Sequence, residues 1–358
     1  MSFSEILVIN PGSTSTKIAV YRNEKVIFLK SIRHDVEELS KFERVTDQYS
    51  FRKAIIMEEL KETDTVMDLI EVVIGRGGLI KPVKSGVYEV NDKLKHDLLH
   101  SYAGEHASNL GGLIADDIAG SLPKAKAYIA DPVVVDELQD IARISGHPLF
   151  KRNSIFHALN QKATGAYHAK LCKTNYKEMN LIIAHLGGGI SIGAHKKGKV
   201  IDVNQGLDGE GPFAPERSGT LPTGDLVRLC YSGKYKEEDV LKMVTGEGGM
   251  VAYLGTNNAY EIEQKVLKGE KKASLIFRAM AYQVAKYIGA MSVVMQGEVD
   301  AILLTGGVAY SEWFVNEITE QVQFIAPVHV YPGEDEMEAL AMNGLKILKG
   351  KAEIHQYQ

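Results

Sequence analysis

The chain has 358 residues, and at ~100–200 residues per domain this length predicts two domains. Its 41 Lys and Arg residues stand against 46 Asp and Glu residues, and the net charge of -5 excludes a bulk positive field for nucleic acid or an acidic membrane surface. Its 2 Cys residues are too few for a disulfide framework, and we find no export signal and no run of about 18 uncharged apolar residues. We therefore expect a reduced, cytoplasmic setting, with neither nucleic acid nor membrane as a partner.

The first predicted element is a strand, a tight turn and a hairpin over residues 6–27. An apolar run ends at Asn10, small residues follow at 12–14, and a polar turn at 22–24 precedes a further strand. Lys17, seven residues after Asn10, suits either the outward face of the second strand or a phosphate ligand folded over the turn.

Two apolar runs that end abruptly in turn residues come next. Residues 70–74 stop at Gly-Arg-Gly-Gly, and residues 128–130 stop at Asp131 and a proline, as buried strands of a parallel sheet do. We expect the chain to pass to its second half on a helix over residues 133–144. His157, which follows Phe156, is either a buried hydrogen-bonded histidine or a site residue.

The second half repeats the first. Residues 181–201 again run from an apolar strand to a polar residue, His185, then to small residues and a hairpin. Residues 301–304 and 328–331 echo the later strands, and helical spacing covers 275–295 and 337–349. The duplication predicts two doubly wound α/β halves, with ligands beyond the carboxyl ends of the strands and in the cleft between the halves.

Glycine-rich turns follow three of these strands, at residues 10–14, 185–189 and 305–308. Such turns suit phosphate, because backbone N–H groups converge there and no Cβ blocks a close approach. A single turn of this kind is a weak signal, but two at equivalent places in a duplication favour a phosphate site. The mononucleotide P-loop and the strict dinucleotide fingerprint are both missing from the sequence.

Two arginines are candidate anion ligands. Arg76 lies inside Gly-Arg-Gly-Gly, and Arg217 lies in a glycine- and proline-rich loop at residues 211–220. A structural ion pair is the alternative for each, although planar guanidinium groups clamp carboxylate and phosphoryl oxygens well. Asp131 and the acidic run at 334–338 offer the hard oxygen ligands that Mg²⁺ requires, but such a run is usually a solvated turn.

At this point the sequence resembles a known family. INPGSTSTK, AHLGGGIS, LLTGGVAYS and ERSG resemble the acetate kinase family, within the superfamily of acetate and sugar kinases, heat-shock chaperones and actin. GRGG, DPVVVDEL and PGEDEMEALA look most like its butyrate kinase and branched-chain fatty acid kinase branch. The resemblance implies two duplicated actin-like (ribonuclease H-like) ββαβαβα domains with an interdomain cleft, and a homodimer or higher homo-oligomer. It also implies Mg²⁺-dependent, reversible phosphoryl transfer between ATP and butyrate or a branched short-chain fatty acid, which gives ADP and an acyl phosphate.

The resemblance also implies roles for individual residues. The catalytic set, which includes the first phosphate motif, is Asn10, Lys17, Arg76, Asp131, His157 and Arg217. The nucleotide-binding set is Gly12, Ser13, Thr14, His185, Gly187, Gly188, Gly189, Gly306, Gly307 and Val308. Glu336, with Asn10, is the expected metal ligand, and Glu338 competes with it because the alignment slips by a residue there. Phe156 and Gly78 are expected at the acyl pocket, which Gly78 would enlarge because acetate-using members carry a bulkier residue there.

The resemblance places residues 1–133 and 339–358 in an acyl-substrate and phosphate domain, and residues 134–338 in a nucleotide-binding domain. Two rival functions stay open: an acetate or propionate kinase of the same mechanism, and an actin-like or chaperone-like ATPase switch. A sugar or polyol kinase is disfavoured, because a hydroxyl acceptor calls for a general base and gains little from a carboxylate-binding arginine.

Overall fold

The protein, seen in a computed structural model that describes residues 4–63, 67–102 and 104–358, divides into two compact units. Unit 1 comprises Met1–Val135 and Asp335–Gln358, and unit 2 comprises Asp136–Glu334. The sequence analysis predicted that the chain leaves the first domain after residue 133 and returns to it after residue 338. No helix in the part of the chain that the structure describes is long and apolar enough to cross a bilayer.

Unit 1 is built on a seven-stranded sheet with the order β12-β5-β6-β4-β1-β2-β3. The strands are β1 (Glu5–Pro11), β2 (Ser15–Arg22), β3 (Lys25–Arg33), β4 (Ile70–Arg76), β5 (Val87–Glu89), β6 (Lys126–Ala130) and β12 (Ile354–Gln356). The first three strands form an antiparallel meander, and β4 and β6 add to β1 in parallel. The apolar runs seen in the sequence are therefore the buried central strands, as predicted.

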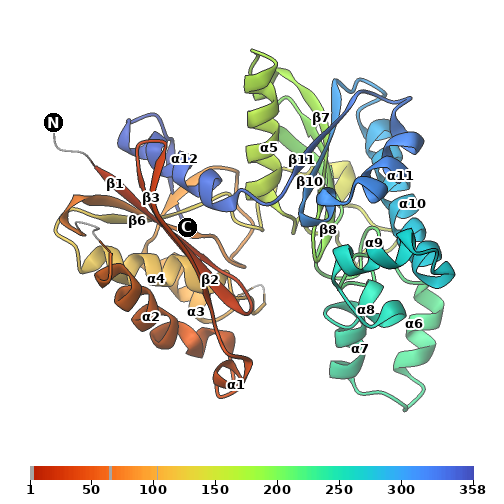
Figure 1. The fold of residues 1–358 in the computed structure, drawn as a ribbon, viewed down its shortest axis with the longest axis horizontal. Helices are drawn as coiled ribbons and strands as arrows, with labels where there is room; N and C mark the ends of the chain where they lie inside the picture. The colour runs from red at the N-terminus through yellow and green to blue at the C-terminus, as the bar shows by residue number, and fades with distance from the viewer. Residues whose placement is uncertain (1–3, 64–66, 103) are drawn as a thin grey trace. The chain divides into compact units, whose positions relative to one another are not determined.

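Helices cover both faces of this sheet, with α12 on one side and α4 on the other (Figure 1). The helices of unit 1 are α1 (Val36–Leu39), α2 (Tyr49–Lys61), α3 (Asp92–Leu99), α4 (Asn109–Gly120) and α12 (Glu336–Leu348), with short 3-10 turns η1 (Val45–Gln48) and η2 (Met67–Leu69). A Cβ on Gly75 of β4 or on Gly111 of α4 would collide with the backbone of the other element, so this glycine pair lets α4 lie close against the sheet.

Unit 2 repeats the sheet with five strands in the order β11-β10-β7-β8-β9. They are β7 (Asn180–Leu186), β8 (Ile190–Lys196), β9 (Lys199–Val203), β10 (Ala301–Gly306) and β11 (Val328–Pro332). The pairing directions match those of β1, β2, β3, β4 and β6. Even the irregularity recurs, because the register shifts after Val20 in β2 and after Ala194 in β8, which pair with equivalent positions of β1 and β7. The structure thus confirms the predicted duplication.

The core of unit 2 lies between this sheet and α10, whose Phe277, Met280 and Val284 pack on Ile182 and Ile302. The helices are α5 (Ala158–Leu171), α6 (Thr223–Cys230), α7 (Glu237–Val244), α8 (Gly249–Leu254), α9 (Ala259–Leu267), α10 (Lys271–Val294) and α11 (Glu312–Val322), with 3-10 turns η3 (Asp140–Arg143), η4 (Tyr176–Glu178) and η5 (Gly307–Tyr310). Helix α5 covers the opposite face of the sheet (Figure 1).

Each unit contains one helix that follows the last strand of the other repeat in chain order. Helix α5 follows β6, the last strand of the first repeat, but belongs to unit 2. Helix α12 follows β11, the last strand of the second repeat, but belongs to unit 1, where it packs on β1 and β4. Both helices begin directly after turns that the sequence analysis singled out, so each brings functional candidates to a sheet edge.

The helix predicted over residues 133–144 is wrong. Apart from the short turn η3, this segment is irregular. Its backbone bonds to distant segments instead: Val83 N–H donates to Val134 O at 3.3 Å, and Gln139 N–H donates to Ile201 O at 3.0 Å. These long-range hydrogen bonds override the local helical spacing.

Candidate active site

In unit 1, two neighbouring parallel strands bring Asn10 and Arg76 together. Ile9 of β1 pairs with Gly75 of β4, so the next residue of each strand lies at the same sheet edge. Alternation places Asn10 on the face shared with Ile6 and Val8, which is the face that α12 covers. Asn10, the polar residue that ends the apolar run, therefore has its side chain on the face that α12 covers.

Asn10, Arg76 and Glu336 form a closed polar cluster at the start of α12. Asn10 Nδ2 donates to Glu336 Oε2 at 2.8 Å, and Arg76 Nη2 lies 3.1 Å from Glu336 Oε1. Arg76 Nη1 also approaches Asn10 Oδ1, at 3.5 Å. Asn10 is 6% exposed and Glu336 is 4% exposed, so the charges are held in a largely buried setting. Arg76 retains further N–H donors for a ligand.

The two candidate glutamates occupy different positions. Glu336 faces the cluster, whereas Glu338 is exposed one residue beyond Met337. Burial first, and then the charges of Glu338 and Asp335, raise the pKa of Tyr21 on β2, so the Glu338 carboxylate lies toward that ring.

Lys17 lies beside this cluster. It is the direct cross-strand partner of Asn10 in the pairing of β1 with β2, and its side chain is exposed. Direct partners share a sheet face with Cβ atoms ~5 Å apart. Within the described ranges no carboxylate lies within ion-pair distance of Lys17, so its charge is available to a bound anion.

Arg52 of α2, which the sequence analysis missed, holds the turn between β1 and β2. Its guanidinium is 0% exposed and donates to three main-chain oxygens, those of Gly12 at 2.7 Å, Ser13 at 2.9 Å and Ser15 at 3.2 Å. It also donates to Thr16 Oγ1 and Gln48 Oε1. Burial lowers the pKa of Arg52 to about 10, which leaves it charged at neutral pH.

This clamp turns the carbonyl groups of the serine-rich turn inward. No carboxylate of the described chain lies within ion-pair distance of Arg52, so a positive charge sits beneath the predicted phosphate turn without a protein counter-ion. Ser13 and Thr14, above it, are exposed. The arrangement suits an anion on the outer side of the turn.

Asp131 has a different environment from the one expected. Its Oδ1 accepts from Ser85 Oγ at 2.6 Å and from Gly86 N–H at 2.9 Å, and its backbone φ is +37°. Arg76 bonds to Asn10 and Glu336, and the catalytic role of Asp131, which is to order the waters of a metal or to orient Arg76, stays a prediction.

Gly78, which we expected to enlarge an acyl pocket, makes room for the start of α4. A Cβ on Gly78 would lie 2.6 Å from Asn109 Cα and 2.8 Å from its N, at the start of α4. Asn109 Oδ1 also accepts from Leu79 N–H at 2.8 Å. Gly78 is therefore a packing glycine that lets α4 approach, and the space beside it is filled.

In unit 2, the equivalent turn follows β7 at residues 187–189. None of its three glycines has a positive φ, and close neighbours explain two of them. A Cβ on Gly187 would lie 2.7 Å from His185 Nε2, and one on Gly189 would collide with the Arg217 guanidinium. Glycine is thus needed here for close approach rather than for backbone conformation.

His185 lies beneath this turn and is 0% exposed. Its Nδ1 is 2.8 Å from Asn160 Oδ1 on α5, and its Nε2 is 3.2 Å from Glu334 Oε1. The structure therefore corrects its expected place among the nucleotide contacts, because His185 supports the turn from below. The side chain of Phe156, predicted at the acyl pocket, is also buried.

Arg217 lies against the same turn, and its guanidinium donates to Gly206 O. Its loop is packed rather than disordered: Phe213 and Ala214 belong to the core of unit 2. The backbone of the loop is tied to the glycine turn by the bond from Glu216 N–H to Gly188 O, at 3.2 Å.

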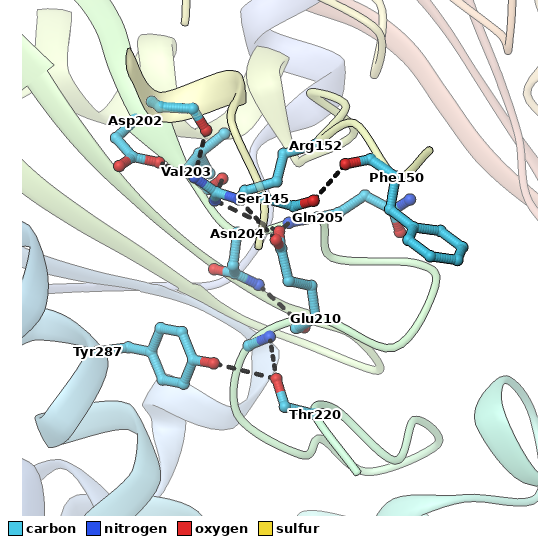
Figure 2. Close-up of polar contacts among 12 residues, drawn as sticks. Ser145, Phe150, Arg152, Asp202, Val203, Asn204, Gln205, Glu210, Thr220 and Tyr287 are labelled. Atoms are coloured by element: carbon cyan, nitrogen blue, oxygen red, sulfur yellow. Dashed lines mark hydrogen bonds and ion pairs between the residues drawn. The ribbon is translucent and has the colours of Figure 1, made fainter. Parts of the chain in front are cut away.

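A polar network lies at the base of this loop (Figure 2). Arg152 Nε donates to Glu210 Oε1 at 2.7 Å, and Arg152 Nη1 donates to Asp202 Oδ1 at 3.0 Å, at the end of β9. Glu210 Oε2 accepts in turn from Gln205 N–H at 2.6 Å. Further along the loop, Thr220 Oγ1 lies 3.1 Å from Tyr287 OH on α10 (Figure 2).

His157 is the N-cap residue of α5, and the N-terminus of a helix favours an anion. Its ring stacks on that of His185, with centroids 3.7 Å apart and an interplanar angle of 12°. Its Nδ1 is 2.9 Å from Ser191 Oγ on β8. Two neighbours therefore fix the plane and the rotation of the imidazole.

The third glycine turn, after β10, is closed by a reciprocal pair of hydrogen bonds, each 3.0 Å long, between the backbones of Gly306 and Gly333. Gly306 has a φ of +93° and is the residue that requires glycine. Gly307 has open space at its Cβ position, so a ligand can approach its backbone there. Val308 packs its side chain into the core of unit 2.

The residues at Asn10 suit a magnesium ion. Mg²⁺ prefers oxygen ligands and is usually held by one or two carboxylates with waters completing the shell. Glu336 supplies one carboxylate, and Asn10 beside it donates to that carboxylate through Nδ2 while its amide oxygen lies 3.5 Å from Arg76 Nη1. Within the described ranges no group of three or more His, Cys, Asp or Glu side chains could hold a metal alone, so most ligands of an ion here would be water or phosphate.

The structure thus brings the predicted residues together in two sets. Unit 1 joins Asn10, Arg76 and Glu336, with Lys17 beside them. Unit 2 joins five further candidates around its glycine turn: His157, His185, Gly187, Gly189 and Arg217. Asp131 accepts from Ser85 and Gly86, and Gly78 packs against the start of α4.

The chain is similar to several known proteins. Residues 149–331 match the model of the acetokinase family. Butyrate kinase 2 of Clostridium acetobutylicum is 53% identical over 354 residues, which are 99% of this chain and 99% of that protein.

Solved structures share the fold. The acetate kinase of Porphyromonas gingivalis superposes with a TM-score of 0.78 at 20% identity, over 96% of this chain and 100% of that one. A propionate kinase from Francisella tularensis superposes with a TM-score of 0.75 at 18% identity, over 95% of this chain and 98% of the other. These likenesses confirm the predicted fold class, a duplicated actin-like α/β architecture.

Proposed function

Because this chain belongs to the acetokinase family, we propose that it is a carboxylate kinase that transfers phosphate reversibly between ATP and butyrate or a branched short-chain fatty acid. The products in the forward direction are ADP and an acyl phosphate. The relative at 53% identity is a butyrate kinase that matches along nearly all of its length, which supports this choice of acceptor over acetate or propionate.

One observation supports the proposal most strongly: each half of the duplication sets an arginine against its strand-end turn. Arg76 lies on Asn10 in unit 1, and Arg217 lies on Gly189 in unit 2. A reaction between two anions needs such cations, because the carboxylate and the phosphate repel each other. A hydroxyl acceptor would instead need a general base. None of the roles proposed for these residues is that of a general base.

The reaction asks the protein for position and charge rather than for a strong base. A carboxylate is already a nucleophile, so its oxygen must be placed in line with the γ-phosphorus while negative charge is neutralised. In the proposed assignment Arg76 orients the substrate carboxylate, and Arg217 and His157 stabilise the equatorial phosphoryl oxygens. Lys17 neutralises the γ-phosphate from the face it shares with Asn10.

Glu336 and Asn10 would hold Mg²⁺ through oxygen atoms. When bound, the ion neutralises phosphate charge and orients the phosphate chain. The N–H groups of Gly188, Gly189 and Gly307 are the proposed nucleotide contacts, since that of Gly187 already donates to Gly189 O at 3.1 Å. The pairing of Glu336 with both Asn10 and Arg76 favours it over Glu338 as the metal carboxylate.

The test is to incubate the protein with ATP, Mg²⁺, hydroxylamine and straight or branched acids of two to six carbons, and to measure the trapped hydroxamate. Butyrate exceeds acetate by two methylenes, each worth about 0.8 kcal/mol when buried, so we expect roughly tenfold higher kcat/KM for butyrate. Equal or better use of acetate would replace the butyrate assignment by an acetate kinase. ATP hydrolysis without hydroxamate from any acid would favour the nucleotide-switch alternative.

A further inference from the structure

We propose that Ser191, Gln161, His195 and Tyr176 form a hydrogen-bonded chain that keeps the proton of neutral His157 on Nε2. This nitrogen is then a fixed donor toward the transferring phosphoryl group. The part played by the phosphoryl group rests on the proposed function, whereas the placement of the proton follows from contacts within unit 2.

The chain runs across the interface between β8 and α5. Alternate residues of β8, namely Ser191, Gly193 and His195, face α5. Gln161 lies in the first turn of α5, four residues after His157, and its main-chain N–H donates to His157 O at 2.9 Å. Its side chain therefore spans from Ser191 to His195.

The direction of the hydrogen bonds is set at Ser191. Gln161 Nε2 donates to Ser191 O at 3.0 Å and to Ser191 Oγ at 2.8 Å. The same hydroxyl oxygen lies 3.3 Å from the main-chain N–H of His157, which donates to it. Ser191 is 0% exposed, so its hydroxyl hydrogen needs a protein acceptor. The acceptor within reach is His157 Nδ1, at 2.9 Å. In the neutral ring the proton is then on Nε2.

The far end of the chain agrees with this orientation of Gln161. His195 is fully buried, and burial lowers its pKa well below the usual value, so the ring is neutral. Its Nε2 lies 2.8 Å from Gln161 Oε1, and its Nδ1 lies 2.6 Å from Tyr176 OH. Because Gln161 Oε1 can only accept, His195 donates through Nε2 and accepts from the tyrosine through Nδ1.

Two glycines leave room for this chain. A Cβ on Gly193 would lie 2.7 Å from Gln161 Oε1 and 3.0 Å from His195 Nε2. A Cβ on Gly165, inside α5, would lie 2.7 Å from Cε2 of Tyr176. Glycine destabilises the interior of a strand or a helix, so its presence at both positions fits a requirement for the chain itself.

The first experiment reads the tautomer directly. The whole protein, labelled with [¹⁵N]histidine, is studied by NMR at about pH 8, above the usual histidine pKa of ~6.5, and the His157 signals are identified by their loss in His157→Gln. We expect an unprotonated Nδ1 and a protonated Nε2, and a shift of the proton toward Nδ1 in Ser191→Ala. A proton on Nδ1 of the wild-type ring, alone or together with one on Nε2, would overturn the proposal.

The second experiment separates kcat from KM. Removing a transition-state donor outright costs on the order of 10²–10³ in kcat, so we expect about tenfold from Ser191→Ala, which only misorients the donor, with KM changed less than about twofold. Ser191→Cys keeps a weak donor and should recover part of the loss. Tyr176→Phe should lower kcat by about threefold at the same KM. Tyr331→Phe, which removes the hydroxyl from the buried pair with His168 at 2.7 Å, is the matched control and should change neither.

The third experiment compares two replacements of His157 itself. The amide nitrogen of Gln overlies the Nε2 position of histidine, and that of Asn overlies Nδ1, so His157→Gln should retain at least about tenfold more kcat than His157→Asn. The reverse order would refute the assignment of the donor to Nε2. Failure of the proposed function would look different, because the wild-type protein would then form no acyl phosphate while its NMR tautomer stayed as described.

Discussion

The Arg76–Glu336 pair makes a prediction in which stability and catalysis separate. The 3.1 Å contact joins side chains that are 18% and 5% exposed. At an effective dielectric of about 20, charges at that distance attract by about 5 kcal/mol, and losing one partner of a buried pair typically costs ~3–5 kcal/mol. Because Arg76 keeps some solvent access, we expect Arg76→Met to lower the free energy of unfolding of unit 1 by about 3 kcal/mol.

The double variant tests the reason for that loss. In Arg76→Met/Glu336→Gln no uncompensated charge remains, so we expect a loss of only about 1 kcal/mol. The Glu336→Gln variant completes the cycle, and the loss in the double variant should be smaller than the sum of the two single losses by at least about 2 kcal/mol. Both variants that lack Arg76 should still lose on the order of 10²-fold in kcat. If the stability losses added within about 0.5 kcal/mol, the two side chains would not be coupled and the reasoning would be refuted.

The assay must follow unit 1 separately. The single Trp313 lies in unit 2, where it stacks on Phe277 at 5.3 Å, so tryptophan fluorescence in urea reports on unit 2. Hydrogen exchange in peptides from β1 and β4 reports on unit 1. Lys126→Met is the matched control, because Lys126 also lies 3.1 Å from a carboxylate, that of Glu89, but on the surface. It should change unfolding little.

The remaining predictions concern the serine-rich turn, its neighbours and assembly. Arg52→Met should leave three carbonyl groups without a donor and raise the KM for ATP by about tenfold or more, whereas Arg52→Lys should recover part of the loss because it keeps the charge. Burial, and then the charge of Arg52, lowers the pKa of His34 to about 4. Because folded His34 resists protonation, the free energy of unfolding of unit 1 falls by about 3 kcal/mol as the pH falls from ~6.5 to about 4. In urea unfolding at several pH values, His34→Gln should make the free energy of unfolding depend less on pH over this range. Lys17→Met should lower kcat by about 10²-fold with little change in unfolding, since its exposed side chain has no ion pair among the described residues. Sedimentation should find at least a dimer, and a monomer at assay concentration would contradict that expectation.

The sequence predicted the sheets well because their central strands are continuous apolar runs. The duplication was readable because both halves end the first strand in a polar residue followed by small ones, Asn10 in one and His185 in the other. The pairing of Asn10 with Arg76 follows from that order, since adjacent parallel strands end at one edge.

Other features were hidden because long-range contacts decide them. Arg52 reads as the polar face of an ordinary helix, and only the fold shows it turned inward to the carbonyl groups of Gly12 and Ser13. Gly78 reads as open space, but the start of α4 fills that space. One signal was available and missed: Ser191, Gly193 and His195 alternate along a strand that is otherwise apolar.

The most direct measurement of the central claim is ³¹P NMR of the wild-type protein with ATP, Mg²⁺ and butyrate. The account predicts an acyl phosphate resonance that grows in step with ADP, and that fails to appear in Arg76→Lys and Arg217→Lys proteins with folded circular dichroism spectra. Release of inorganic phosphate at the same rate with and without butyrate, and no acyl phosphate signal, would contradict it.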